Sequence, residues 1–265
     1  MLQYTFIQNA LIAAFLIALL CPSVGTFLVL KRYSMMGDTL SHASFAGVAI
    51  GLVAGFNPIL SAFIFTSICA IFIEVLRNYY KKYSELILVI VMTLCLGIAI
   101  TLISTGKASA NVNSFLFGSI LTVTREDLYT ILILSIVCIC LLISLFNKIA
   151  YVTFDEDGAK IAGLNIKLIN YIFALLVGTT IAVSMRIMGI LVVSSMIAVP
   201  VATAMQLNKG FKLTFIYSLI FGLLDIMVGL FTSFYIDCAP GGTIAITSVV
   251  ILIITITFSK IKCTN

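Results

Sequence analysis

The chain has 265 residues, of which 62% are hydrophobic and only 9% are charged, and its mean hydropathy is +1.24. Soluble domains carry roughly 25% charged residues, so a chain this poor in charge cannot cover a surface that faces water. The net charge of +5 is small and its basic residues are scattered, so we expect no nucleic-acid partner. The composition predicts an integral membrane protein with many spans.

Nine apolar stretches follow one another, each close to the roughly 20 residues that a helix needs to cross a bilayer. The first lacks a basic leader and a cleavage site, so we interpret it as a retained span. Backbone groups in lipid must be satisfied internally, and the alternation of a β-barrel is absent. We expect an all-α polytopic membrane protein with eight to nine transmembrane helices in a single domain, 1–265. The stretches are 9–30, 36–56, 58–76, 86–104, 128–147, 168–185, 188–207, 213–235 and 243–259.

Lysine and arginine are distributed unevenly over the connections between these stretches. If the connections after spans 1, 3, 5 and 7 and the C-terminus face the cytoplasm, that side holds twelve of the fifteen basic residues. Cytoplasmic loops are enriched in Lys and Arg, so we expect the N-terminus outside and the C-terminus in the cytoplasm. The twelve are Lys31, Arg32, Arg77, Lys81, Lys82, Lys148, Lys160, Lys167, Lys209, Lys212, Lys260 and Lys262.

The second stretch opens with two residues that are costly in lipid, Asp38 and His42, the latter the only histidine of the chain. Four residues apart on a helix, they share one face. Gly47, Gly51 and Gly55 lie on the opposite side and form a stripe of small residues, which favours close packing against a neighbouring helix. The segment therefore has a polar face and a packing face.

Imidazole nitrogen and carboxylate oxygen are ligands that Zn²⁺ and Mn²⁺ accept. Asp38 and His42 alone are too few for a closed tetrahedral site, whereas two copies of the chain would supply two of each. We expect a metal or proton pathway on this face. In the alternative interpretation, the two side chains only hydrogen-bond each other.

Asp225 lies in the middle of the eighth apolar stretch. We expect its carboxyl group to be hydrogen-bonded to a Ser or Thr of a neighbouring helix and protonated by burial. A role in lining the pathway is the alternative.

Two connections are longer than linkers need to be. Residues 105–127 lie outside the membrane or re-enter it, because their apolar core "FLFGSIL" is too short to span. The longest cytoplasmic connection, 150–167, contains three acidic residues that can cap a short helix and small residues that permit close approach. It is either a charged cap on an interfacial helix or a docking surface for a cytoplasmic partner. These residues are Asp155, Glu156, Asp157, Ala159, Ala162 and Gly163.

Several motifs of soluble and membrane enzymes are absent from the sequence. It has no GxxxxGK[ST], so it binds no nucleotide through a P-loop, and neither HExxH nor GxSxG occurs. An intramembrane enzyme using Ser41 and His42 is disfavoured, because adjacent helical residues point about 100° apart. Seven cysteines without CxxC spacing are interpreted as core residues.

Five blocks occur in order along the chain: "MGDTLSHASFAGVAIG" (36–51), "SFLFGSILTVTREDL" (114–128), "FDEDGAKIAGL" (154–164), "LVVSSMIAVPVATAMQL" (191–207) and "SFYIDCAPGGTIAIT" (233–247). Together they resemble the permease subunits of ABC importers for zinc and manganese, over almost the whole length. The resemblance implies a type II ABC importer-like permease that forms a homodimer in the bacterial cytoplasmic (inner) membrane.

The resemblance also implies the partners and the site. Each permease subunit would bind a separate ATP-binding subunit that hydrolyses ATP, and an extracytoplasmic metal-binding protein would deliver the ion. No cofactor would be bound permanently, and the transported ion would be Zn²⁺ or Mn²⁺. Asp38 and His42 match the family's metal pathway, and residues 154–164 match its coupling helix, which docks on the ATPase.

The first and third blocks are slightly more similar to zinc importers, so zinc is favoured, with a manganese or iron importer of the same family as the alternative. A siderophore or vitamin B12 permease is a remote alternative, because such chains are longer. The expected topology places Asp38 close to the cytoplasmic end of its helix, whereas a central site would lie nearer the midplane.

Overall fold

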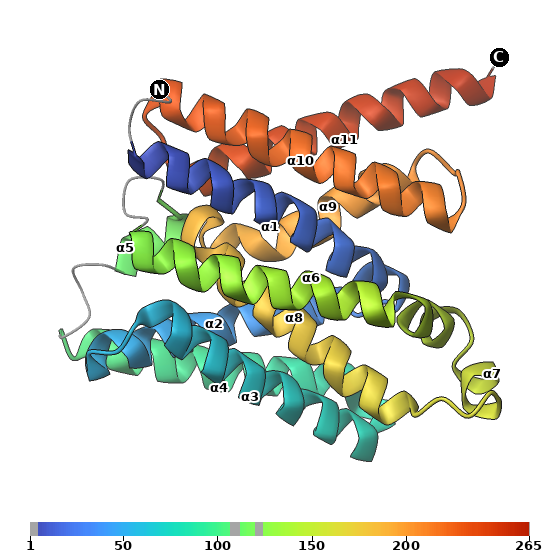
Figure 1. The fold of residues 1–265 in the computed structure, drawn as a ribbon, viewed down its shortest axis with the longest axis horizontal. Coiled ribbons are helices and arrows are strands. Elements are labelled where there is room, and N and C mark those ends of the chain that lie inside the picture. Colours follow the sequence, from blue (N-terminus) through green and yellow to red (C-terminus); the bar gives the residue numbers. More distant parts are fainter. Residues whose placement is uncertain (1–4, 107–111, 120–123, 265) are drawn as a thin grey trace.

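The computed structural model describes residues 5–106, 112–119 and 124–264, and within these ranges the regular structure is helical (Figure 1). Each of the nine predicted stretches coincides with one long helix. Two short helices and a single 3₁₀ turn complete the described part. The long helices are α1 (Thr5–Leu30), α2 (Ser34–Ala54), α3 (Pro58–Tyr79), α4 (Ser84–Ser104), α6 (Arg125–Phe154), α8 (Ile166–Met188), α9 (Ile190–Met205), α10 (Phe211–Ile236) and α11 (Pro240–Thr264); the short ones are α5 (Val112–Phe117), α7 (Glu156–Ile161) and the 3₁₀ turn η1 (Lys81–Tyr83).

Seven of the described helices are long and apolar enough to cross a membrane. The two other long helices fall short for different reasons. Helix α2 carries Asp38 and His42, which lower its hydropathy, and α9 has only 16 residues. The structure thus supports a multi-pass helical protein, while the count of eight to nine spans stays a prediction.

The two ends of the bundle carry different connections (Figure 1). The C-terminus and α7 lie at one end, together with the connections 31–33, 80–83 and 206–210. The N-terminal end of α1 and α5 lie at the opposite end. The connections that the sequence assigns to the basic side therefore lie at the same end of the molecule.

Helix α1 is one of the most buried long helices and contacts α6, α8, α9 and α10. Between helices in lipid, close van der Waals packing replaces the hydrophobic effect. Gly25 of α1 meets the backbone of Ile197 on α9 so closely that a Cβ atom would overlap its carbonyl oxygen. Towards the α7 end, Phe27 stacks edge-on against Phe146, with 5.4 Å between ring centroids. Small residues and aromatic rings thus fix α1 against its neighbours.

The glycine stripe of α2 packs as predicted at two of its three positions. A Cβ atom on Gly47 or Gly51 would overlap α3 at Ala62 and Ser61, and the Ser61 hydroxyl donates to the Gly47 carbonyl at 2.7 Å. Gly55 is different: it ends α2 with a φ of 74°, and a Cβ atom there would meet no neighbouring atom within 4 Å. The prediction is wrong for Gly55, which serves as a left-handed helix cap.

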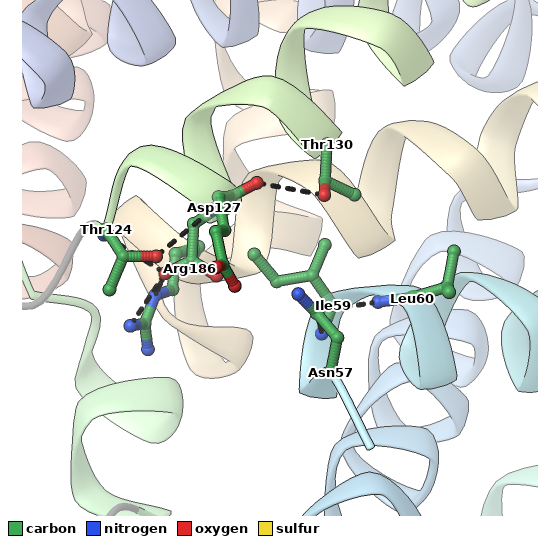
Figure 2. A network of polar contacts seen from close by, with 8 residues as sticks. Asn57, Ile59, Leu60, Thr124, Asp127, Thr130 and Arg186 are labelled. Atoms are coloured by element: carbon green, nitrogen blue, oxygen red, sulfur yellow. Dashed lines mark hydrogen bonds and ion pairs between the residues drawn. The ribbon is translucent and has the colours of Figure 1, made fainter.

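A buried ion pair closes the end of the bundle that holds α5 (Figure 2). Arg186 near the end of α8 lies 3.0 Å from Asp127 in the first turn of α6, and each is less than a tenth exposed. Asp127 also forms a capping box with Thr124, whose side chain accepts from the Asp127 amide. Arg186 stacks over Phe115 of α5 at 4.6 Å. The described part of the predicted re-entrant stretch is thereby held against α8.

Candidate metal pathway

Asp38 and His42 are the fifth and ninth residues of α2, and both side chains are half-buried. At 1.5 Å per residue, they lie about 6 Å and 12 Å from the first residue of the helix. Helix α2 begins at the end of the bundle that holds α7 (Figure 1). The pair therefore lies in the half of the helix nearer α7, as the expected topology implies.

The structure gives the two side chains different partners. The Ser194 hydroxyl of α9 donates to Oδ1 of Asp38 at 3.4 Å, whereas Nδ1 of His42 is buried and has no hydrogen-bond partner. Within the described residues no hydrogen bond joins Asp38 to His42. The alternative interpretation of a self-contained pair is therefore not supported.

The remaining faces of α2 are fixed by hydroxyl groups that bond to neighbouring helices. Thr39 reaches the Leu88 carbonyl of α4 at 3.3 Å, and Ser44 donates to the sulfur of Met185 on α8 at 2.9 Å. The α3 contact at Gly47 holds a third side. The backbone that carries Asp38 and His42 is thereby fixed against three neighbouring helices.

One chain offers too few ligands for a closed metal site. The described residues contain no group of three or more His, Cys, Asp or Glu side chains that could hold a metal ion. Asp38 and His42 offer one carboxylate and one imidazole, which would be half of a four-coordinate set. With these two side chains a single chain could not close a metal site.

Asp225 lies elsewhere in the molecule. Its helix α10 packs mainly against α1, α9 and α11, its side chain is 0% exposed, and neither carboxyl oxygen has a partner among the described residues. The expected bond to a Ser or Thr of a neighbouring helix is wrong, because neither carboxyl oxygen has a hydrogen-bond partner among the described residues. The structure does not bring Asp225 together with Asp38 and His42, and a pathway role stays a prediction.

The acidic segment after α6 forms the predicted short helix. Asp155 ends α6 and caps α7, where its carboxylate accepts from the Gly158 amide at 2.8 Å. Glu156 and Asp157 are exposed in the first turn. Ala159 is fully buried. The exposed surface of the helix therefore lies at its two ends.

The far end of α7 is open and apolar. Ala162 and Gly163 are exposed, and Gly163 has a φ of 81° that ends the turn. Ile161, which the sequence reasoning did not single out, is 88% exposed. Ile161, Ala162 and Gly163 thus form a short exposed apolar segment at the tip of α7.

A partly buried lysine lies at the same end of the bundle. Lys31 donates to the Asn170 side chain of α8 at 2.7 Å and lies 5.0 Å above the Phe173 ring. Burial lowers the pKa of Lys31 to about 8, although Glu74 and Glu156 oppose this shift. Lys31 thus connects the end of α1 electrostatically to α7.

Ser194 is the main site residue that sequence reasoning missed. It belongs to the block "LVVSSMIAVPVATAMQL", which carries two adjacent serines in a mostly apolar helix. Those hydroxyls were the available signal. Asp38, the partner of Ser194 on α2, is 156 positions away in sequence, so spacing alone could not connect the two residues.

Comparison with known proteins places this geometry in a family. Residues 3–259 match the ABC 3 transport family. A probable metal transport system membrane protein of Treponema pallidum is 47% identical over 98% of both chains. The manganese transport system membrane protein MntC of Listeria monocytogenes is 29% identical, over 98% of this chain and 92% of its own.

A solved structure shares the whole architecture. The structure described as PsaBC from Streptococcus pneumoniae in complex with Fab has a TM-score of 0.85 and 28% identity, over 98% of this chain and 96% of that chain. The resemblance seen in the five sequence blocks is therefore confirmed. The chain belongs to the ABC 3 transport family and is a membrane permease subunit of a metal transport system, not the ATPase.

Proposed function

We propose that this chain is the permease of an ATP-driven importer that passes a divalent transition-metal ion into the cytoplasm by alternating access. One observation supports this most directly: a half-buried carboxylate and an imidazole with an unpartnered nitrogen share one face of α2. Such a pair binds an ion without enclosing it, and a transport site must release what it binds.

Two copies of the chain complete the site in this proposal. Asp38 and His42 from each protomer give two nitrogen and two oxygen ligands, which both Zn²⁺ and Mn²⁺ accept. The sequence blocks favour zinc, whereas relatives carry names of manganese and iron systems. The proposal therefore covers both ions, with iron as the further alternative.

The proposed orientation places eight to nine spans in the bacterial inner membrane, with α7 and the C-terminus in the cytoplasm. The gathering of the basic connections at the α7 end supports it. In this orientation Ile161, Ala162 and Gly163 face a separate ATP-binding subunit, and the α5 end receives the ion from an extracytoplasmic binding protein. The whole chain, 1–265, acts as a single permease domain with its coupling segment at 150–167.

Reconstituted uptake tests the proposal. Proteoliposomes that contain the permease, its ATPase and its binding protein should take up Zn²⁺ or Mn²⁺ only with ATP, and Asp38→Ala or His42→Ala should abolish uptake. Ser41→Ala is the matched control, because its hydroxyl bonds to Gly37 within α2 at 2.8 Å. Wild-type uptake by both alanine variants would refute the site, and absence of ATP-driven uptake of any of these ions would refute the function.

The docking surface has its own test. Ile161→Asp should prevent the ATPase from co-purifying with the permease, because it places a charge where an apolar side chain is 88% exposed. Lys160→Ala, which changes the neighbouring exposed residue, should leave the complex intact. Normal co-purification of the Ile161→Asp variant would contradict the assignment of α7.

A further inference from the structure

The hydroxyl of Ser194 is the polar group that α9 presents to the metal residues of α2. Ser194 is the fifth residue of α9, and its Oγ lies 3.4 Å from Oδ1 of Asp38. Its neighbour Ser195 points elsewhere and donates to the Val192 carbonyl of its own helix at 2.7 Å. Adjacent helical residues point about 100° apart, so only one of the two serines can face α2.

A hydroxyl in this position determines which oxygen of the Asp38 carboxylate is free to bind an ion. When Ser194 donates to Oδ1, the other oxygen of Asp38 is left for an ion, on the side chain that shares a helix face with His42. Carboxylate ligands of metals are commonly oriented by such hydrogen bonds, and losing one typically costs 10–100-fold in metal affinity or activity.

At 3.4 Å the bond is longer than the roughly 2.5–3.0 Å of a strong O–H···O bond. The bond joins α9 to α2. Helix α9 also packs against α1, α10 and α11. A movement of α9 relative to α2 would therefore change the orientation of Asp38 directly.

We infer that Ser194 is a positioning residue for metal binding: it holds Asp38 in the orientation that, together with His42, receives the ion. This inference rests on the proposed metal site of α2 and extends that site from one helix to two. It predicts that the hydroxyl at position 194 matters and that the hydroxyl at position 195 does not.

Direct binding of Mn²⁺ to the purified permease–ATPase complex tests the inference, with free Mn²⁺ followed by electron paramagnetic resonance. Ser194→Ala should raise the Kd about 10- to 100-fold, while Ser195→Ala stays within about twofold of the wild type. Ser194→Thr retains a hydroxyl and should recover most of the affinity. The melting temperature of Ser194→Ala should match that of Ser195→Ala, which a merely structural role would not produce.

The outcomes separate this inference from the proposed function. If Asp38→Ala abolishes Mn²⁺ binding but Ser194→Ala does not weaken it, the positioning role is wrong and the metal site stands. If Ser194→Ala and Ser195→Ala weaken binding equally, or Ser194→Thr behaves like Ser194→Ala, the role of the hydroxyl is also refuted. If Asp38→Ala binds Mn²⁺ like the wild type, the proposed site and the role of Ser194 fall together.

Discussion

Two carboxylates in membrane helices of this protein have opposite surroundings. Asp38 of α2 is half-buried, accepts a hydrogen bond from another helix and shares a face with His42. Asp225 of α10 is completely buried, and neither of its oxygens has a partner among the described residues. The first carboxylate can be reached by an ion, whereas the second is sealed between apolar helices.

The difference shows why the cost of burying a carboxylate is a poor guide to its role. An ionisable residue in a membrane helix is a candidate functional group by default, and both aspartates qualify in the sequence. Access and partners distinguish them: Asp38 has both, and Asp225 has neither. We therefore expect the function to depend on the charge of Asp38 and not on that of Asp225.

The largest effect should come from neutralising Asp38. Asp38→Asn keeps the shape of the side chain but removes the negative charge that attracts a divalent cation, so ATP-driven metal uptake should fall at least about 100-fold, the upper range for a perturbed metal site. Uptake of radioactive Zn²⁺ or Mn²⁺ into proteoliposomes measures it. Unchanged uptake would place the pathway on another face of the bundle.

The next largest effect, on stability, concerns Asp127, a buried carboxylate that has an ion-pair partner. Arg186→Leu removes the cation that pairs with Asp127 at 3.0 Å and leaves an isolated buried charge. Breaking such a pair costs about 3–5 kcal/mol, which corresponds to a fall in Tm of roughly 10 °C for a protein of this size. A thiol-reactive dye can follow unfolding, because four of the described cysteines are buried.

A double variant provides the control for the ion pair. In Asp127→Asn/Arg186→Leu no unpaired charge remains, so much of the lost stability should return. If Arg186→Leu melts like the wild type, the ion pair does not stabilise the end of the bundle that holds α5. If the double variant melts no higher than Arg186→Leu, the loss comes from packing over Phe115 and not from charge.

A smaller effect is expected from Lys31, whose charge is partly buried at the α7 end. Its pKa is lowered from 10.5 to about 8 in the folded chain, mainly by burial. Between these values the unfolded chain binds more protons, so the free energy of unfolding should rise with pH from 8 to 10.5.

The contribution of Lys31 can be isolated by comparison with a neutral variant. Partial solvation limits it to about 1–2 kcal/mol. Relative to Lys31→Met, the Tm of the wild type should increase by a few degrees between pH 7.5 and 10. A constant difference across this range would show that Lys31 keeps an ordinary pKa in the folded chain.

Much of the fold followed from the sequence for simple physical reasons. The length of each apolar stretch predicts a long helix. Asp155 predicts the start of α7, because its carboxylate can accept a hydrogen bond from a backbone amide of the first turn. Two glycines of α2 packed as predicted, because spacing along one helix determines which residues share a face. The prediction for Gly55 was wrong because a left-handed cap and a packing stripe both favour glycine, and the sequence alone does not distinguish the two.

Only the part of the candidate site that lies on one helix, α2, was predicted from the sequence. Asp38 and His42 could be paired because they lie four residues apart, within local geometry. Ser194 could not be added, since it approaches Asp38 through the packing of α9 on α2. For the same reason, the lack of a partner for Asp225 could not be foreseen: it depends on how α1, α9 and α11 pack around α10.

The smallest effect should come from Asp225, and it completes the comparison with Asp38. Asp225→Asn replaces a carboxyl group that has no hydrogen-bond partner with a neutral group of the same shape, so neither the packing nor any described bond is lost. We expect uptake within about twofold of the wild type and a change in stability below about 1 kcal/mol, because no bond is broken. Uptake and melting of Asp225→Asn should be measured beside Asp38→Asn in the same preparation. A loss of uptake similar to that of Asp38→Asn, with normal melting, would give Asp225 a place in the pathway and end the distinction between an accessible and a sealed carboxylate.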